Sequence, residues 1–388
     1  MIKIALINPR YHPNIFDGGE MHVRKLVSHF TKFADVTVLT TKAIDKESWK
    51  DEVDEVSKKD CINIIRFSSE TDRNARKFND LTHSLYADQN PKIKDLTEWI
   101  KQVGPYTPSF YEYLQQNFNN YDLFFFVGYN NAFTYFGLPL VKQKAVLIPL
   151  THKEAMLRFN IFDRIFSSPR IIIPSSEGEK KIIQERFNSL PPLFIVGIDV
   201  NKPTKILKNT DNKIKKPYCI YIGRISRFKG TWELIEKFME FKSHNKSKLN
   251  LVLIGENNDF IKIPKRKDII HIPKVSEIQK FSLLADSEFI INSSYYESVS
   301  LILLEAWQVK KPVLVNGKCD VLKSQVIQSD GGLFYENYKE FEAMILWLNS
   351  HSRERSLLGK NGFKWAKKNY SEIIIRKKLE SLVNAMIN

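Results

Sequence analysis

Short apolar runs rich in β-branched and aromatic residues alternate with amphipathic helical patterns, and this alternation starts twice along the 388 residues. The clearest helical pattern covers residues 21–33, where apolar residues recur at three- and four-residue spacing beside a basic face. Such alternation is typical of parallel sheets covered by helices. The first series of predicted strands covers residues 2–7, 36–40, 62–67, 123–127, 145–150 and 170–174.

A lysine-rich stretch separates the two series. Residues 201–217 contain lysines at regular short intervals and little that could enter a core, so we place the link between two domains there. Residues 353–388 predict terminal helices that pack on the body. The second series of predicted strands covers residues 219–223, 249–255, 269–272, 288–292 and 312–316. The sequence therefore predicts an α/β chain of two doubly wound sheets that face one another across a ligand-binding cleft.

The composition narrows the functional classes. With 43% hydrophobic residues the chain can build two cores, which excludes a wholly disordered protein. Lysine and arginine number 59 against 44 acidic residues, and the net charge of +15 favours anionic partners. The three cysteines, Cys61, Cys219 and Cys319, lack metal-ligand spacing and suit a reducing cytoplasm. We see no export signal and no apolar run long enough to span a bilayer.

The first candidate site is the segment 223–230, which follows a predicted strand and precedes a helical pattern. Gly223 and Gly230 permit a tight turn and close backbone approach, while Arg224 and Lys229 can direct two positive charges at an anion. A diphosphate would fit this arrangement. The alternative is an ordinary strand-to-helix turn with solvated basic residues.

The second candidate site is the segment 296–307, again after a predicted strand. Ser298 or Ser300 can cap a helix whose free N–H groups and dipole attract phosphate. Glu297 stands at the start and Glu305 about two turns along, so two carboxylates would bracket one anion site. They would need hydrogen bonds from ligand hydroxyls, such as those of a sugar and a ribose. The alternative makes Glu297 a surface residue before a buried helix.

Two further features lie in the first half of the chain. Gly18 and Gly19 enter the first amphipathic helix within Asp17-Gly18-Gly19-Glu20, which suits close contact with phosphate or sugar, although a simple tight turn is equally compatible. This is not the Gly-x-Gly-x-x-Gly fingerprint, so we set a nicotinamide dehydrogenase aside. His152 follows a predicted strand, where a neutral imidazole could hydrogen-bond a donor sugar hydroxyl, or could be structural.

Several motifs are missing from the sequence. There is no strict Asp-x-Asp pair, so we expect no divalent metal site. There is also no P-loop and no Gly-x-Ser-x-Gly elbow, which argues against the common NTPase and hydrolase classes. We therefore expect phosphate to be bound without magnesium.

Together, Gly223-Arg224-x4-Lys229-Gly230 and Glu297-x7-Glu305 resemble the donor-site signature of retaining glycosyltransferases of family 4, which have the GT-B fold. The resemblance covers most of the chain. It implies a Rossmann-like acceptor-side domain over residues 1–200, a link over 201–217, and a donor-binding domain over 218–370. In such families the last helix commonly returns to the first domain, which assigns residues 371–388 there.

The resemblance also implies roles for individual residues. Arg224 and Lys229 would hold the donor diphosphate and stabilise it as it leaves. Glu297 would contact the transferred sugar, and Glu305 the ribose hydroxyls. The implied donor-binding groups also include Gly223, the backbone N–H groups near Ser300 and Leu301, and Gly18, Gly19 and His152 from the facing domain.

The implied activity is metal-independent, retaining transfer of a hexosyl group from a UDP- or GDP-sugar to a glycan or lipid-linked acceptor, as in cell-surface polysaccharide or lipopolysaccharide biosynthesis. No cofactor is expected beyond the donor substrate. The chain departs from many relatives by having Ser298 and Ser300 in place of glycines and Lys153 in place of an acidic residue, which leaves the donor sugar open.

Basic, aromatic-bearing segments lie in the predicted acceptor domain at residues 24–33 and 106–113. We hypothesise that they dock the protein at the anionic inner face of a membrane, the alternative being a solvated basic face. Two other functions remain. A GT-B nucleotide-sugar epimerase would share the architecture, whereas a nucleic-acid-binding protein would rest on charge alone and lacks an aromatic-studded recognition motif.

Overall fold

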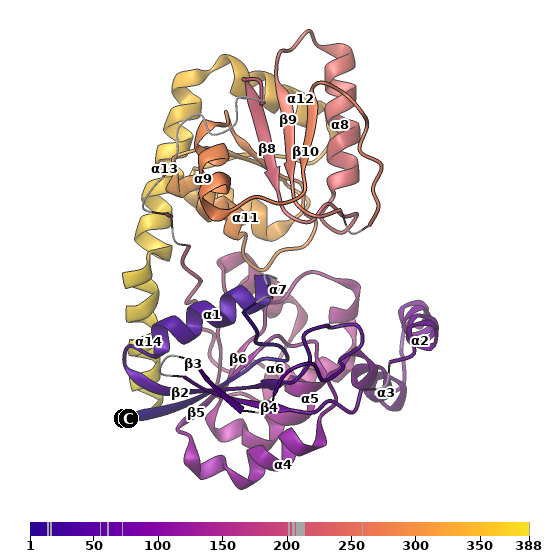
Figure 1. The fold of residues 1–388 in the computed structure, drawn as a ribbon, viewed down its shortest axis with the longest axis vertical. Coiled ribbons are helices and arrows are strands. Elements are labelled where there is room, and N and C mark those ends of the chain that lie inside the picture. Colours follow the sequence, from indigo (N-terminus) through magenta and orange to yellow (C-terminus); the bar gives the residue numbers. More distant parts are fainter. Residues whose placement is uncertain are drawn as a thin grey trace. The chain divides into compact units, whose positions relative to one another are not determined.

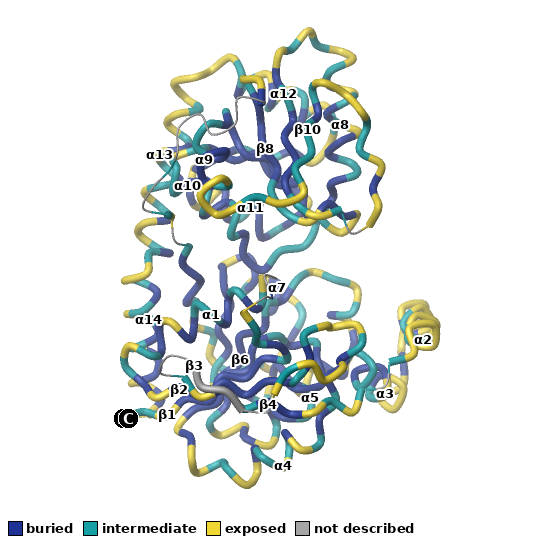
Figure 2. The backbone as a smooth tube through the Cα atoms, in the orientation of Figure 1, coloured by how far each residue is buried: buried dark blue, intermediate teal, exposed yellow. Residues whose placement is uncertain are grey.

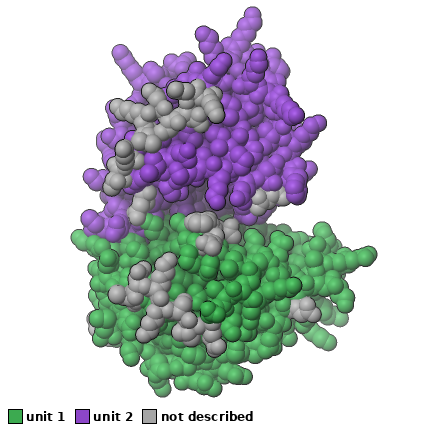
Figure 3. Space-filling view, viewed as in Figure 1, with its two compact units in different colours: residues 1–175, 179–198, 376–388 green, residues 176–178, 199–375 purple. Residues whose placement is uncertain are grey.

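The computed structural model describes residues 1–13, 15, 18–54, 56–59, 62–71, 73–200, 202–203, 206, 214–257 and 259–387. The chain forms two compact units, which Figure 3 colours separately. Unit 1 contains Met1–Ser175, Glu179–Ile198 and Arg376–Asn388, and unit 2 contains Ser176–Gly178 and Asp199–Ile375. Most of the predicted link, together with Asp17 and Cys61, lies outside the described residues.

Unit 1 is built on a seven-stranded sheet with the order β3-β4-β2-β1-β5-β6-β7. β3 pairs antiparallel with β4, and the other neighbours are parallel. The strand order reverses between β1 and β5, as in doubly wound sheets. The strands are β1 (Ile2–Ile7), β2 (Ala34–Thr41), β3 (Val56–Lys59), β4 (Ile62–Phe67), β5 (Leu123–Val127), β6 (Ala145–Ile148) and β7 (Ile171–Ile172).

The helices of unit 1 lie between and around these strands (Figure 1). They are α1 (Gly18–Phe30), α2 (Ala75–Ala87), α3 (Ile93–Val103), α4 (Pro108–Gln116), α5 (Ala132–Gly137), α6 (Asp163–Ser167) and α7 (Glu177–Arg186), with short 3-10 turns at Phe118–Asn120, Leu138–Lys144, Ala155–Arg158 and Asn160–Phe162.

The core of unit 1 centres on β5. Its five apolar residues are all buried, because β5 lies inside the sheet and is covered on both faces. The α1 helix presents the apolar stripe predicted from the sequence, and the Phe30 ring lies 4.7 Å from the Phe125 ring of β5. Figure 2 shows the same pattern, with the central strands buried and the outer helices exposed.

Unit 2 is built on a six-stranded sheet with the order β10-β9-β8-β11-β12-β13, and all neighbours are parallel. Counted from β8, this is the 3-2-1-4-5-6 order of a Rossmann sheet, with its reversal between β8 and β11. The strands are β8 (Tyr218–Ile222), β9 (Asn250–Ile254), β10 (Ile269–Ile272), β11 (Ile290–Asn292), β12 (Val313–Asn316) and β13 (Gly332–Tyr335). The predicted α/β class with two doubly wound sheets is confirmed.

The later helices complete the chain. In the part assigned to unit 1, Arg170 donates to the Met386 carbonyl at 2.9 Å, and Lys378 donates to the Val196 carbonyl at 3.1 Å. By contact this returning segment begins at Arg376, five residues after the range implied by the resemblance. The helices are α8 (Thr231–His244), α9 (Glu277–Asp286), α10 (Leu301–Gln308), α11 (Asp320–Ser329), α12 (Tyr338–Ser350), α13 (Ser352–Tyr370) and α14 (Glu372–Ile387).

Two strands were not predicted from the sequence. β3 is a short antiparallel edge strand, and β13 begins at Gly332, which lacks the side chain that marks a strand pattern. The close packing of β13 explains this glycine, because a Cβ at Gly332 would lie 2.1 Å from the Val313 carbonyl oxygen.

The basic segments predicted to face a membrane bury most of their apolar side chains. Leu26, Val27, Phe30 and Phe110 are at most 3% exposed, and the Arg24 guanidinium donates to backbone carbonyls within unit 1. These segments therefore do not present an apolar face to solvent. Within the described ranges, no helix combines the length and the apolar character needed to cross a bilayer.

Candidate active site

The carboxyl ends of β8 and β11 lie side by side where the strand order of unit 2 reverses. β8 leads into residues 223–230 and β11 into residues 293–300, so the two motifs singled out from the sequence leave the sheet at neighbouring points. Open parallel sheets bind ligands outside the strand ends at such a reversal. The topology therefore places both motifs around one candidate site.

Gly230 allows these two loops to touch. Its φ is +64°, and a Cβ there would lie 2.3 Å from the Ser293 carbonyl oxygen, so a larger residue would push the loops apart. The contact is closed by the Ser293 hydroxyl, which donates to the Lys229 carbonyl at 2.9 Å. At the other end of the loop the Gly223 N–H donates to the Ile254 carbonyl at 2.9 Å and continues the sheet.

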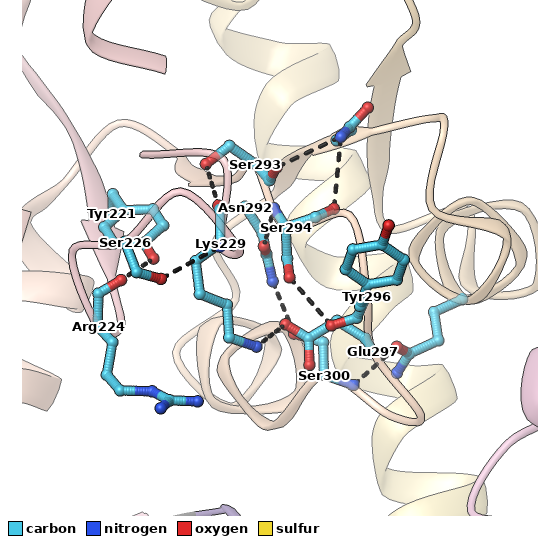
Figure 4. Close-up of polar contacts among 12 residues, drawn as sticks. Tyr221, Arg224, Ser226, Lys229, Asn292, Ser293, Ser294, Tyr296, Glu297 and Ser300 are labelled. Atoms are coloured by element: carbon cyan, nitrogen blue, oxygen red, sulfur yellow. Dashed lines mark hydrogen bonds and ion pairs between the residues drawn. The ribbon is translucent and has the colours of Figure 1, made fainter. Parts of the chain in front are cut away.

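An ion pair joins the two loops through their side chains. The Lys229 Nζ lies 2.8 Å from Glu297 Oε1, and the two side chains are 20% and 16% exposed. In Figure 4, Lys229 and Arg224 extend from their loop in the same direction. The Arg224 guanidinium is exposed and makes no hydrogen bond or ion pair with the described residues. Two cations and one carboxylate thus leave a formal excess of positive charge at the strand ends.

Glu305 lies on α10 and pairs with a lysine that sequence reasoning missed. Lys280 Nζ, on α9, lies 2.8 Å from Glu305 Oε1 and 3.0 Å from Glu277 Oε1. Burial alone would lower the pKa of Lys280, but the two carboxylates outweigh it and raise that pKa above its ordinary value. Lys280 therefore stays charged beside Glu305.

The start of α10 differs from the sequence prediction in two ways. The helix begins at Leu301, so Glu297 lies in the preceding loop and Glu305 is about one turn, not two, into the helix. Ser300 is the N-cap residue, but its hydroxyl does not cap the helix, because it accepts a hydrogen bond from Asn292 Nδ2 at 3.0 Å.

The backbone N–H of Ser300 is also engaged, since it donates to Gln325 Oε1 at 3.0 Å. The predicted role of the N–H groups near Ser300 and Leu301 in ligand binding stays a prediction, and in this structure the Ser300 N–H is occupied by Gln325. The free N–H groups of the helix start at Leu301, because the first turn of a helix has no intrahelical acceptors. Beside them, the buried Gln325 Nε2 has no hydrogen-bond partner among the described residues.

Gly18 and Gly19 form the first residues of α1 in unit 1. A Cβ at Gly18 would meet nothing within 4 Å, so this position is open to a ligand. A Cβ at Gly19 would lie 3.7 Å from Leu150 Cδ1, which places the start of α1 against the segment after β6. His152 is in that segment, two residues beyond Leu150, so the structure brings these predicted residues together.

His152 has a carboxylate neighbour that the sequence alone did not reveal. His152 Nδ1 lies 3.6 Å from Glu154 Oε1, and the buried Tyr129 hydroxyl donates to the same oxygen at 2.8 Å. The residue after the histidine is Lys153, but the carboxylate one position further reaches the imidazole instead. A carboxylate neighbour of this kind can orient an imidazole.

Three neighbours of the predicted residues were therefore not found from the sequence: Glu154 in unit 1, and Lys280 and Gln325 in unit 2. The i, i+3 spacing of Glu277 and Lys280 predicts a local pair, but nothing in the sequence directs Lys280 to α10. Among the residues that the structure describes, there is no cluster of three or more histidine, cysteine or acidic side chains that could hold a metal ion.

Comparison with known proteins adds to this geometry. The family model described as glycosyl transferases group 1 matches residues 203–365. This region, less than half of the chain, is similar to group 1 glycosyltransferases. It contains Arg224, Lys229, Glu297 and Glu305, whereas Gly18, Gly19 and His152 lie outside the match.

Two curated glycosyltransferases are similar to part of the chain. An uncharacterized glycosyltransferase of Methanocaldococcus jannaschii is 22% identical over 239 residues, which are 58% of this chain and 60% of that protein. The capsular polysaccharide biosynthesis glycosyltransferase CapM of Staphylococcus aureus is 24% identical over 244 residues, or 58% and 63% of the two chains. The match thus spans less than two thirds of each curated relative.

Solved structures resemble the whole chain, including the residues outside the match to the family model. Sucrose-phosphate synthase of Thermosynechococcus elongatus has a TM-score of 0.73 at 14% identity, with 100% of this chain and 99% of that chain covered. Anabaena HepE, solved in complex with UDP and glucose, has a TM-score of 0.68 at 12% identity, with 99% and 100% covered. The fold is GT-B, as predicted.

Proposed function

We propose that this protein is a glycosyltransferase that moves a sugar from a nucleoside diphosphate sugar, UDP- or GDP-linked, to a glycan or lipid-linked acceptor. The observation that carries the proposal is the convergence of Arg224, Lys229 and Glu297 at the reversal of the unit 2 sheet. A diphosphate carries concentrated negative charge, and this is the place where an open sheet binds its ligand.

The reaction breaks the bond between the anomeric carbon of the donor and an oxygen of the diphosphate. Negative charge grows on the diphosphate as it leaves, so preorganised cations stabilise the transition state more than the bound donor. Lys229 retains two N–H donors beyond the one that Glu297 uses, and Arg224 offers a planar fork for bidentate contact with phosphate. The first N–H groups of α10 add their partial positive charge.

The remaining site residues fit the other parts of the donor. Glu297 would contact the transferred sugar while remaining paired with Lys229, and Glu305 with Lys280 would hold the ribose hydroxyls. His152 would hydrogen-bond a sugar hydroxyl, with Gly18 leaving space for the ligand. We propose that the reaction retains the anomeric configuration and needs neither metal nor cofactor, because the protein's own cations neutralise the diphosphate.

Two relatives support the proposed substrates. CapM is named for capsular polysaccharide biosynthesis, which supports a polysaccharide or lipopolysaccharide product for this chain. HepE was solved with UDP and glucose, which supports UDP as the nucleotide. On this support we propose that the reaction belongs to cell-surface glycan synthesis and takes place on the cytoplasmic side.

The test is a panel of UDP- and GDP-sugars, assayed for transfer and hydrolysis with and without chelator. Transfer that survives the chelator supports the proposal, and the product's anomeric configuration, read by NMR coupling constants, tests retention. Interconversion of the donor sugar without transfer would instead identify an epimerase. Failure of both UDP and GDP to raise the melting temperature would contradict nucleotide binding at this site.

We propose further that the basic surface of unit 1 associates with an anionic membrane face through charge, since the apolar residues of the two candidate segments are buried. Liposome flotation tests this. We expect recovery with anionic vesicles that falls as salt is raised, whereas equal recovery with neutral vesicles would exclude it.

A further inference from the structure

Glu179 is a wholly buried carboxylate that the proposed reaction does not use. It lies in the first turn of α7 and is 0% exposed. Both of its oxygens accept backbone hydrogen bonds: Oε1 from the Thr151 N–H at 2.5 Å and Oε2 from the Ser175 N–H at 2.6 Å. A buried carboxylate that holds two backbone groups fixes the geometry of both.

The two backbone groups belong to segments that follow neighbouring strands. Thr151 comes shortly after β6 and Ser175 shortly after β7, and these strands are parallel and adjacent. Glu179 therefore bridges the two chain segments just beyond the carboxyl edge of the unit 1 sheet. The next residue after Thr151 is His152, so the bridge fixes the backbone from which the predicted sugar-binding imidazole projects.

The turn that leads to His152 needs such support. Leu150 has a φ of +54°, a left-handed conformation that costs energy for a residue with a side chain. A conformation of this kind persists only where surrounding contacts hold it. The Thr151 N–H bond to Glu179 is the hydrogen bond immediately after the strained residue, so its loss would let the turn relax.

Protonation of Glu179 would weaken this bridge. Burial raises the pKa of Glu179 to about 7, although the two backbone N–H groups and His152 act to lower it. Among the described residues, His152 after β6 and Tyr129 after β5 interact electrostatically with Glu179, and Glu154 Oε1 lies 3.6 Å from His152 Nδ1. An ionised carboxylate accepts at both oxygens, whereas a protonated one turns one oxygen into a donor.

We propose that Glu179 is a positioning residue for His152, acting through the Thr151 backbone, and that its ionisation keeps the imidazole in place for the donor sugar. The inference rests on the proposed function. It assigns Glu179 no contact with the substrate. Its effect is on the orientation of His152, and nucleotide binding at the strand ends of unit 2 does not depend on it.

The test compares the full-length wild type with Glu179→Gln, which keeps the size of the side chain but accepts at only one atom. The matched control is Glu185→Gln, on the same helix, whose carboxylate is 51% exposed. For Glu179→Gln we expect kcat to fall about 10- to 100-fold, with the affinity for UDP or GDP unchanged. The control should match the wild type in all measurements.

A structural readout separates positioning from a general loss of stability. In protein labelled with ¹⁵N-threonine, the Thr151 amide signal of the wild type should shift with a midpoint near pH 7, and this shift should be absent in Glu179→Gln. The wild-type kcat should rise over the same pH range. Whether the Thr151 amide shift and the kcat of the wild type share one pH midpoint can be measured on the wild type alone, so this part of the test remains available even if the variant does not fold.

The outcomes are distinct. Two results would overturn this inference and leave the proposed function standing. One is a kcat of Glu179→Gln equal to that of the wild type. The other is a pH midpoint of kcat in the wild type that differs from the midpoint of the Thr151 amide shift. A wild type that binds no nucleotide and transfers no sugar would overturn the proposed function itself. A fall in nucleotide affinity equal to the fall in kcat would show a general structural defect and would also overturn the positioning role.

Discussion

The two units use an arginine differently in the loop after their first strand. In unit 1, Arg10 follows β1 and pairs with Glu20 at the start of α1, with Nη2 2.5 Å from Oε1 and side chains 10% and 9% exposed. Arg10 also donates to the Ile44 carbonyl at 3.0 Å. In unit 2, Arg224 follows β8 and is exposed, and its guanidinium makes no hydrogen bond or ion pair with the described residues.

The same sheet topology is thus combined with two different uses of charged side chains. Both sheets reverse their order at the first strand, so both could bind a ligand there. Unit 1 uses its charges internally, through Arg10 with Glu20 and through Glu179 with backbone N–H groups. Unit 2 leaves Arg224, and part of the hydrogen-bonding capacity of Lys229, available to a ligand. The first arrangement stabilises a scaffold, and the second is suited to an anionic substrate.

The largest effect is expected from Glu20→Gln, which tests whether the Arg10–Glu20 ion pair stabilises unit 1. This change removes the Glu20 charge from the buried ion pair with Arg10, and we expect unit 1 to lose about 3–5 kcal/mol of stability. Thermal unfolding monitored by circular dichroism should show a clearly lower melting temperature. Arg224→Gln is the matched control and should unfold like the wild type. An unchanged melting temperature in Glu20→Gln would mean that the Arg10 pair does not hold the scaffold.

Lys229→Ala tests the other side of the comparison. Because it removes a cation from the leaving diphosphate, we expect turnover to fall roughly 10²- to 10³-fold, with little change in melting temperature. Steady-state transfer rates measure this. The control is Lys246→Ala. Lys246 is exposed and lies between α8 and β9, before the amino end of β9 and away from the carboxyl strand ends. Wild-type turnover in Lys229→Ala would remove this residue from the mechanism.

The buried carboxylate of Glu179 makes the stability of unit 1 depend on pH. The unfolded chain has its ordinary carboxyl pKa of 4.5, and burial raises the folded value to about 7. Between these values the folded protein binds a proton that the unfolded chain has released, so the contribution of Glu179 to stability is lost as pH rises, by about 3 kcal/mol in all. The melting temperature of the wild type relative to Glu179→Gln should therefore decline from pH 5 to pH 7 and then level off. A constant difference across this range would show that Glu179 does not titrate there.

Arg224→Lys is expected to have the smallest effect. The charge is kept, but the planar fork that can grip two phosphate oxygens is lost. Loss of one charged hydrogen bond, about 1.5 kcal/mol, corresponds to a roughly tenfold lower kcat/KM. Arg227→Lys, in the same loop, is a suitable control. Equal rates for Arg224→Lys and the wild type would show that charge alone is needed at this position.

Much of the fold could be predicted because it depends on local side-chain patterns. The apolar run of β5 and the stripe of α1 are signals of burial that tertiary packing did not override. β13 escaped prediction because Gly332 weakens its pattern. The candidate site residues were singled out by charge and glycine spacing, and their roles stay predictions. Lys280 and Glu154 could not be found, because their pairing with Glu305 and His152 depends on where separate segments meet.

Local sequence patterns were enough to predict the two doubly wound sheets and the residue types beyond their strands, since hydrophobic periodicity and glycine spacing act over short distances. Which charged groups pair within the protein, and which remain for a ligand, depends on the packing of the whole chain. The Ser300 N–H, expected at the ligand, is taken by Gln325, and Glu179, unnoticed in the sequence, holds Thr151 and Ser175. Hydrogen bonds and ion pairs act over a few ångströms in space, and only the packed chain sets those distances.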